Sequence, residues 1–184
     1  ATNFIGNGRT LVLGHATADA TLDWQQPISL NGGSRTVEVG DGSAEIDALM
    51  SGVISGGSAG NSPFNKTGEG TLAFTAQNIY DGDTIVTAGT LMIGNGGTSG
   101  GVSQNSTNIM VDSGATLAVN RSDTVTQGSN TLKAAISGDG DFSQIGSGTT
   151  ILTLANTYTG GTAINGGTLK LSGSGTLGDH TAGS

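Results

Sequence analysis

This sequence of 184 residues predicts an all-β fold, a parallel β-helix (solenoid). Three observations support this prediction. Residues 64–100 align without a gap with residues 142–178, and 15 of the 37 positions are identical. Short apolar runs with a period of two recur along the chain, and 34 glycines break it into brief segments. A duplicated block of short strands and turns is typical of repeat folds, in which each unit buries its apolar face against the next.

The strand signals are short runs with apolar residues at i and i+2, the spacing of a half-buried strand. The residue between them is often polar, as at Glu38 and Lys170, so one side of each strand faces a core and the other faces water. Helix signals are nearly absent, and the best candidate is one or two turns over residues 43–50. Predicted strands include residues 11–13, 37–39, 72–74, 91–93, 109–111, 117–119 and 169–171.

The turn signals leave two architectures open. Gly with Asn or Asp interrupts the chain every few residues, as at 31–33, 94–97 and 165–167, which fits an antiparallel sandwich or a parallel β-helix. The gap-free repeat, the threonines beside apolar positions and an aromatic content of only 4% favour the β-helix. With roughly 20–25 residues per coil, the chain would form about eight coils and a rod ~40 Å long.

Composition excludes several classes of function. The formal charge of −8 disfavours nucleic acid and anionic membranes as partners. The sequence has no apolar stretch long enough to span a membrane and no signal peptide, so we expect a mature or excised piece that does not insert into a membrane. It has no cysteine, which excludes disulfides and thiolate metal sites.

One stretch carries a specific family resemblance. Residues 152–171 read LTLANTYTGGTAINGGTLKL, and residues 78–84 with 88–91 are a degraded copy. This pattern resembles the passenger-associated transport repeat of bacterial autotransporters, also called the autotransporter-associated β-strand repeat. The resemblance implies that residues 1–184 are one segment of a longer right-handed β-helical passenger, exported to the surface of a Gram-negative cell. It also implies that the segment serves as a stalk, and that each exported coil docks on the coils already folded outside the cell.

The candidate metal ligands and the two histidines are better explained as surface and turn residues than as a metal site. Two Asp-Gly-Asp turns could offer carboxylates to calcium, but the nonapeptide of calcium-binding β-rolls is not sustained, so we expect solvated turns. His15 and His180 lie near opposite ends and would be far apart in a rod, which makes a shared metal improbable. We therefore predict no metal and no cofactor. The turn carboxylates are Asp81, Asp83, Asp139 and Asp141.

A carbohydrate-active enzyme would need clustered carboxylates, often with a basic partner. The carboxylates at 41, 45 and 47, and the pair Lys66 and Glu69, are close in sequence but match no catalytic spacing. We predict no catalytic residue and no enzymatic activity. Trp24 could stack on a sugar, but it shares the inward phase of Leu22, so we expect it to cover the core.

Equivalent residues of the two copies predict repeated structural roles. We expect Tyr80 and Tyr158 to pack alike, and Asn78 and Asn156 to stack in register with other polar turn groups.

The function predicted from sequence is a non-enzymatic stalk or spacer in an exported bacterial surface protein. The alternatives are an adhesin that binds host or matrix glycans through the longer loops 56–63 and 94–104, and a carbohydrate-active β-helix enzyme. Because a β-helix exposes unpaired backbone at both ends, we expect neighbouring coils of the parent chain, or end-to-end self-association, as partners.

Overall fold

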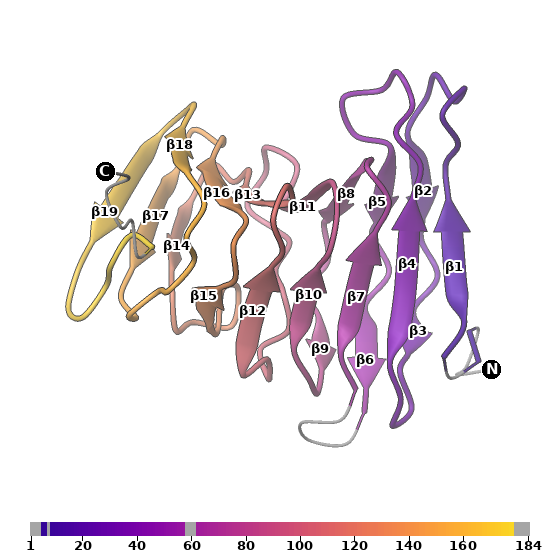
Figure 1. The fold of residues 1–184 in the computed structure, drawn as a ribbon, viewed down its shortest axis with the longest axis horizontal. Helices are drawn as coiled ribbons and strands as arrows, with labels where there is room; N and C mark the ends of the chain where they lie inside the picture. The colour runs from indigo at the N-terminus through magenta and orange to yellow at the C-terminus, as the bar shows by residue number, and fades with distance from the viewer. Residues whose placement is uncertain (1–4, 7, 58–61, 179–184) are drawn as a thin grey trace.

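The computed structural model describes residues 5–6, 8–57 and 62–178 and confirms the β-solenoid. Every ladder between its named strands is parallel. Within these residues no helix is present that is long and apolar enough to cross a membrane. Successive strands therefore wind in one direction around a common axis, as Figure 1 shows, and the sandwich alternative is wrong.

Two faces of the solenoid are continuous sheets. The first sheet has the strand order β1 (Thr10–Leu13), β4 (Arg35–Val39), β7 (Phe64–Thr67), β10 (Thr84–Val86), β12 (Asn108–Val111) and β15 (Ala135–Ser137). The second sheet has the order β18 (Thr162–Ile164), β16 (Asp141–Gln144), β13 (Thr116–Val119), β11 (Thr90–Ile93), β8 (Thr71–Phe74), β5 (Ala48–Met50) and β2 (Leu22–Trp24).

The remaining side consists of two separate three-stranded sheets. One holds β3 (Ile28–Ser29), β6 (Ile54–Gly56) and β9 (Ile79–Tyr80), and the other holds β14 (Thr124–Thr126), β17 (Thr149–Leu152) and β19 (Thr168–Leu171). Between them, the turn that contains β10 and β11 contributes only a single bridge, from Gln77 to Gly101. We call this break in the ladder the seam.

The solenoid has about six turns, not the eight expected from sequence, and the turns differ in length. Along the first sheet, one turn takes 20 residues from Phe64 to Thr84 but 29 from Thr36 to Asn65. The extra residues lie in corner loops such as 40–47 and 94–107. The right-handed sense of winding stays a prediction.

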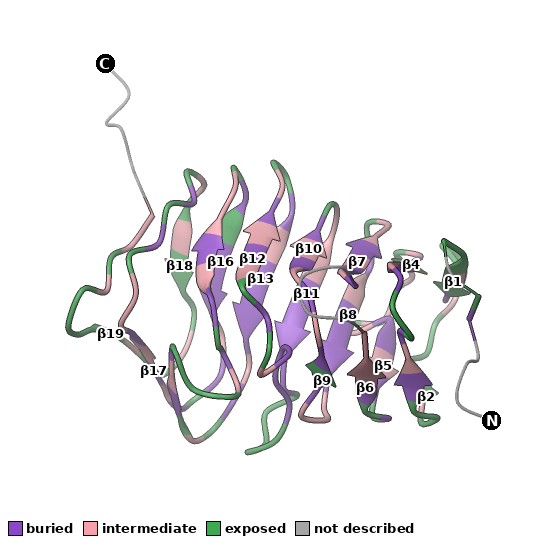
Figure 2. Ribbon diagram, turned by 90° about the horizontal axis from the view of Figure 1, so that it is seen from below, coloured by how far each residue is buried: buried purple, intermediate pink, exposed green. Residues whose placement is uncertain are grey.

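The core is a column of stacked apolar side chains. Leu72, Leu91 and Leu117 occupy the same position of three paired strands, and each is fully buried. The strands that carry them, β8, β11 and β13, are coloured mainly as buried in Figure 2. At the terminal turns three inward positions are exposed instead: Leu22 is 40% exposed, Ile164 58% and Leu171 46%. These three side chains are open because no further turn covers them in the described chain.

All seven predicted strands coincide with observed strands, whereas the candidate helix at 43–50 is wrong. Ala48–Met50 is strand β5, and no helix forms before it. The Asp47 carboxylate accepts hydrogen bonds from the N–H groups of Gly42 and Thr71 at 2.7 and 2.8 Å, which fixes this corner against the next turn. Tertiary contacts thus override a weak local preference.

The two sequence copies do not lie directly above one another. In the first copy, Phe64 pairs with Thr84 on the first sheet and Leu72 pairs with Leu91 on the second. In the second copy, the equivalent pairs lie on the second sheet and on the β14–β17–β19 sheet. Within each copy, equivalent residues pair in the same register. The strands of the second copy, however, lie one face further round the solenoid axis than those of the first.

Candidate functional site

Each copy holds a buried asparagine that joins three successive turns. The Oδ1 of Asn78 accepts a hydrogen bond from Ile54 N at 2.9 Å, and its Nδ2 donates to Gly101 O at 2.9 Å. The Oδ1 of Asn156 accepts from Ile136 N at 2.9 Å, and its Nδ2 donates to Thr176 O at 2.8 Å. The predicted stacking with other polar turn groups holds for Asn156, whose Oδ1 accepts from Gln127 Nε2 at 2.6 Å and whose Nδ2 donates to Gln127 Oε1 at 3.3 Å. Both asparagines also satisfy backbone groups of the turns before and after their own.

A tyrosine and a threonine four residues apart complete this internal motif. The hydroxyls of Tyr80 and Thr84 lie 2.6 Å apart, and those of Tyr158 and Thr162 lie 2.7 Å apart. The Tyr80 ring packs on Phe64 with a centroid distance of 5.8 Å, and the Tyr158 ring on Phe142 at 6.3 Å. Burial raises the pKa of Tyr80. The predicted shared packing role is confirmed.

The four aspartates of the Asp-Gly-Asp turns all accept hydrogen bonds from the following turn. Asp81 accepts from Asn105 at 2.7 Å and Asp83 from Thr107 at 2.7 Å. Asp139 and Asp141 accept from the Thr159 hydroxyl at 2.8 Å and the Gly161 N–H at 2.6 Å. Within the described chain, no three His, Cys, Asp or Glu side chains converge to hold a metal ion. The turn carboxylates thus connect neighbouring coils.

Three of the six basic side chains are buried, which the sequence analysis missed. Arg35 donates to Ile5 O at 2.8 Å, and Arg121 donates to Gly100 O at 2.5 Å and pairs with Asp123 at 2.6 Å. Burial lowers the pKa of Arg35, and hydrogen bonding to Arg121 lowers the pKa of Asp123. The sequence does contain a signal for this burial, because each of these cations lies two positions from an inward apolar residue and therefore on the same side of the strand. The exposed surface is consequently more acidic than the net charge indicates.

Lys66 is the third buried cation. Its Nζ donates to the carbonyls of Thr67, Gly68 and Ala88 at 3.1, 2.6 and 2.9 Å. Burial lowers the pKa of Lys66 to about 8, against the opposing charges of Glu69 and Asp47. In the second copy the aligned residue is Gln144, which donates to Gly146 O at 2.8 Å. The same corner carbonyl is therefore bound by an ammonium in one copy and by an amide in the other.

Two of the enzymatic candidates, Asp47 and Lys66, are engaged by the backbone. Asp47 accepts from the N–H groups of Gly42 and Thr71, and Lys66 donates to the carbonyl of Gly68. The His15 ring is exposed and contacts Thr17, whereas His180 lies outside the described residues. Trp24 pairs with Met50 on the inward side of the second sheet and packs on the core, as predicted.

The two loops proposed for glycan binding are residues 56–63 and 94–104. Residues 58–61 of the first lie outside the described chain. In the second, residues 95–99 are exposed, while Gly100 to Ser103 turn inward and are buried. The Arg121 guanidinium holds this loop by donating to the carbonyls of Thr98 and Gly100. The accessible part is thus a five-residue tip on a rigid base.

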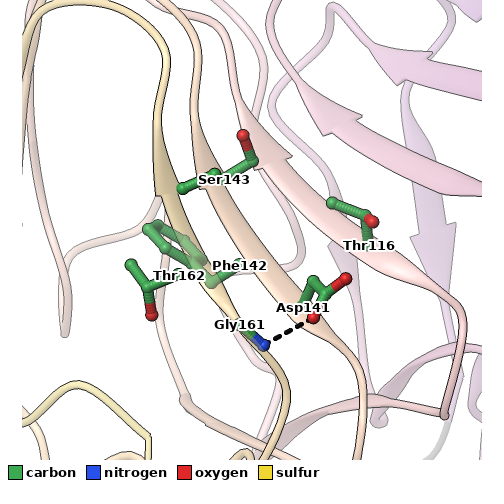
Figure 3. A pocket seen from close by; sticks show the side chains of 7 residues that line it. Thr116, Asp141, Phe142, Ser143, Gly161 and Thr162 are labelled. Carbon is green, nitrogen blue, oxygen red and sulfur yellow. Dashed lines mark hydrogen bonds between the residues drawn. The ribbon is translucent and has the colours of Figure 1, made fainter.

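A shallow pocket of about 270 Å³ lies near the end of the second sheet (Figure 3). Thr116, Asp141 and Ser143 contribute to its lining from β13 and β16. Gly161, which directly precedes β18, and Ala163, which lies within β18, line the other side. One carboxylate oxygen of Asp141 is held by the Gly161 N–H. Hydroxyls beside a carboxylate suit a ligand that carries hydroxyl groups, because each can exchange hydrogen bonds with it.

Comparison with known proteins agrees with this architecture. The family described as Passenger-associated-transport-repeat matches residues 64–93 and 142–171, the two self-paired copies. The chain is 40% identical over 191 residues to the "Adhesin BmaC autotransporter" of Brucella suis biovar 1 (strain 1330). That alignment covers 98% of this chain but only 5% of the relative's length. No solved structure matches significantly.

The repeat matches fall where the structure forms its shortest turns, and the adhesin aligns along nearly the whole chain. The repeat, the parallel winding and the full-length alignment are three agreeing observations. The chain is therefore an autotransporter passenger segment built around two passenger-associated transport repeats.

Proposed function

We propose that this segment is a non-enzymatic stalk that spaces a more distal part of its parent protein away from the surface of a Gram-negative bacterium. The observation that carries the proposal is the self-pairing of each repeat. Phe64 pairs with Thr84 and Phe142 with Thr162, so each copy closes one complete turn from its own residues. Such a unit can be added to a growing rod without contacts from distant sequence.

The described side chains support a scaffold role. Potential catalytic groups such as Asp47 and Lys66 are engaged by backbone groups, and the turn carboxylates bind the following turn. Uncovered core positions at both terminal turns, including Leu22 and Leu171, fit further coils of the same parent chain, or a second copy stacked end to end. Sedimentation of the isolated segment over a concentration series separates a stable monomer from end-to-end association.

The decisive experiment removes one whole turn from the parent protein. Deleting residues 64–83 places Thr84 where Phe64 was paired with Arg35, so the sheet register is kept. We expect normal export, normal adhesion and a rod shorter by ~4.8 Å. Deleting only residues 64–73 serves as the control, because it joins different faces and should impair folding and display. Loss of adhesion by the well-displayed 64–83 variant would contradict a pure spacer.

A second candidate function is direct binding of a host or matrix glycan, which the relative's name as an adhesin and the hydroxyl-lined pocket favour. A glycan array probed with the purified segment tests it. Binding that is lost in Asp141→Ala but kept in Asp19→Ala, an equal change of charge at an exposed site near the opposite end, would establish the pocket. An assay on uronic-acid polymers tests the third candidate, an enzyme.

A further inference from the structure

Three Asn-Gly-Gly triplets occur in the chain, beginning at Asn31, Asn95 and Asn165. An asparagine followed by glycine can react with its own backbone, because glycine has no side chain to hinder attack. The glycine nitrogen forms a bond to the asparagine Cγ, the side-chain amide leaves as ammonia, and a cyclic imide results. Water then opens the imide to aspartate or isoaspartate. The reaction needs no partner other than water.

The structure holds the attacking nitrogen in two of the three triplets. Gly96 N donates to Asn120 O at 2.8 Å, and Gly166 N donates to Gln144 O at 3.3 Å. Both bonds connect one turn of the solenoid to the neighbouring turn. The nitrogen must leave this bond and lose its proton before it can attack, so reaction at Asn95 or Asn165 requires local opening between turns.

The first triplet is different. Asn31 and Gly32 are both exposed, and within the described chain neither the Asn31 side chain nor the Gly32 N–H has a hydrogen-bond partner. The turn is closed one residue later, by the bond from Gly33 N to Leu30 O at 3.1 Å. Asn31 has a φ of 42°, the one positive value of a non-glycine residue in the described chain.

We propose that Asn31 is a site of spontaneous covalent modification, at which asparagine is converted to aspartate and isoaspartate while Asn95 and Asn165 are protected by the coil-to-coil bonds of their glycines. The product adds a negative charge to an already acidic surface. Isoaspartate also lengthens the backbone by one atom in the connection from β3 to β4, where the first turn passes into the second.

A time course of peptide mapping by mass spectrometry tests this, with the intact folded chain held at mildly alkaline pH. We expect Asn31 to convert at least about tenfold faster than Asn95 or Asn165, which corresponds to about 1.4 kcal/mol of protection. The matched control is the same chain in denaturant. Because all three sites share the sequence Asn-Gly-Gly, their rates should then converge to within a few-fold.

Two results would overturn the proposal. One is a folded chain in which Asn95 or Asn165 converts as fast as Asn31. The other is a rate order that stays the same in denaturant, which would assign the difference to flanking sequence instead of the fold. In the variant Asn31→Gln, conversion at position 31 should fall at least about tenfold while the rates at the other two sites stay unchanged.

Discussion

The Oδ1 of Asn156 accepts a hydrogen bond from the backbone N–H of Ile136 at 2.9 Å, and Asn78 bonds Ile54 in the same way. Both asparagines are buried, so water cannot replace them. They act as polar cross-links inside a largely apolar column.

Replacing Asn156 by alanine should therefore destabilise the solenoid by about 2 kcal/mol, because it leaves buried backbone groups without partners. Urea denaturation followed by circular dichroism measures the loss. Asn130 is exposed, and the control variant Asn130→Ala should change stability by less than ~0.5 kcal/mol. Equal effects of the two substitutions would show that the inward amide is dispensable.

The pairs Tyr80–Thr84 and Tyr158–Thr162 should each contribute about 1 kcal/mol through their hydroxyl contact. The variants Tyr80→Phe and Thr84→Val, measured singly and together, give the coupling energy of the first pair. A coupling near zero would mean that the ring packing, and not the hydroxyl, is what the repeat preserves. The variant pair Tyr80→Phe and Tyr158→Phe should be additive, because the two sites belong to separate copies.

Gly146 should not tolerate a methyl group. A Cβ there would lie 2.2 Å from both the N and the O of Arg121, although the residue has no positive φ. Gly146→Ala should therefore force the turns apart and cost at least about 2 kcal/mol. The matched control is Gly97→Ala, where a Cβ meets no atom within 4 Å and φ is likewise not positive. We expect Gly97→Ala to leave the denaturation midpoint unchanged.

Lys66 should make the free energy of unfolding depend on pH above about pH 8. Its pKa is about 8 in the fold against 10.5 for the unconstrained side chain. Between these values the unfolded chain binds more protons, so stability rises as pH increases from 8 to 10.5. Below pH 8 both states are charged and this dependence vanishes.

The second copy supplies the matched variant, because Gln144 occupies the aligned position and donates to the same corner carbonyl. Lys66→Gln should fold normally and lose the alkaline rise in stability. Denaturant midpoints measured from pH 7 to pH 10.5 check this. A wild-type chain with a flat profile, or a variant that keeps the rise, would assign the dependence to another group.

Arg121 should hold the loop at the seam, where the third face has only the Gln77–Gly101 bridge. Arg121→Gln removes the charged donor to Gly100 and the pair with Asp123, and we expect a loss of about 2 kcal/mol. Limited proteolysis should then cut first within residues 95–101. The control Lys133→Gln changes an exposed cation and should leave cleavage unaltered. Cleavage elsewhere would place the weakest turn outside the seam.

Much of the architecture could be predicted from short-range pattern. The runs around Val37, Leu91 and Leu117 became inward strand positions, because a period of two places them on one face whatever the register. The inward cations Lys66 and Arg121 were missed, since pattern alone does not show which carbonyls a corner leaves unpaired. The helix expected at 43–50 failed because Asp47 bonds to Thr71, a contact 24 residues away.

The sequence by itself determined a repetitive, all-β chain of the passenger type and favoured parallel winding over a sandwich, since the repeat and the strand period can be read directly from the residues. Only the tertiary structure decided the number of turns, the rotation of the second copy by one face and the seam. These depend on how many residues each corner holds, and corner length sets the face on which the next strand lands. The total number of residues in all the corners between Phe64 and Phe142 decides on which face Phe142 lies, and no single corner determines that total. Phe64 and Phe142 therefore lie on different faces.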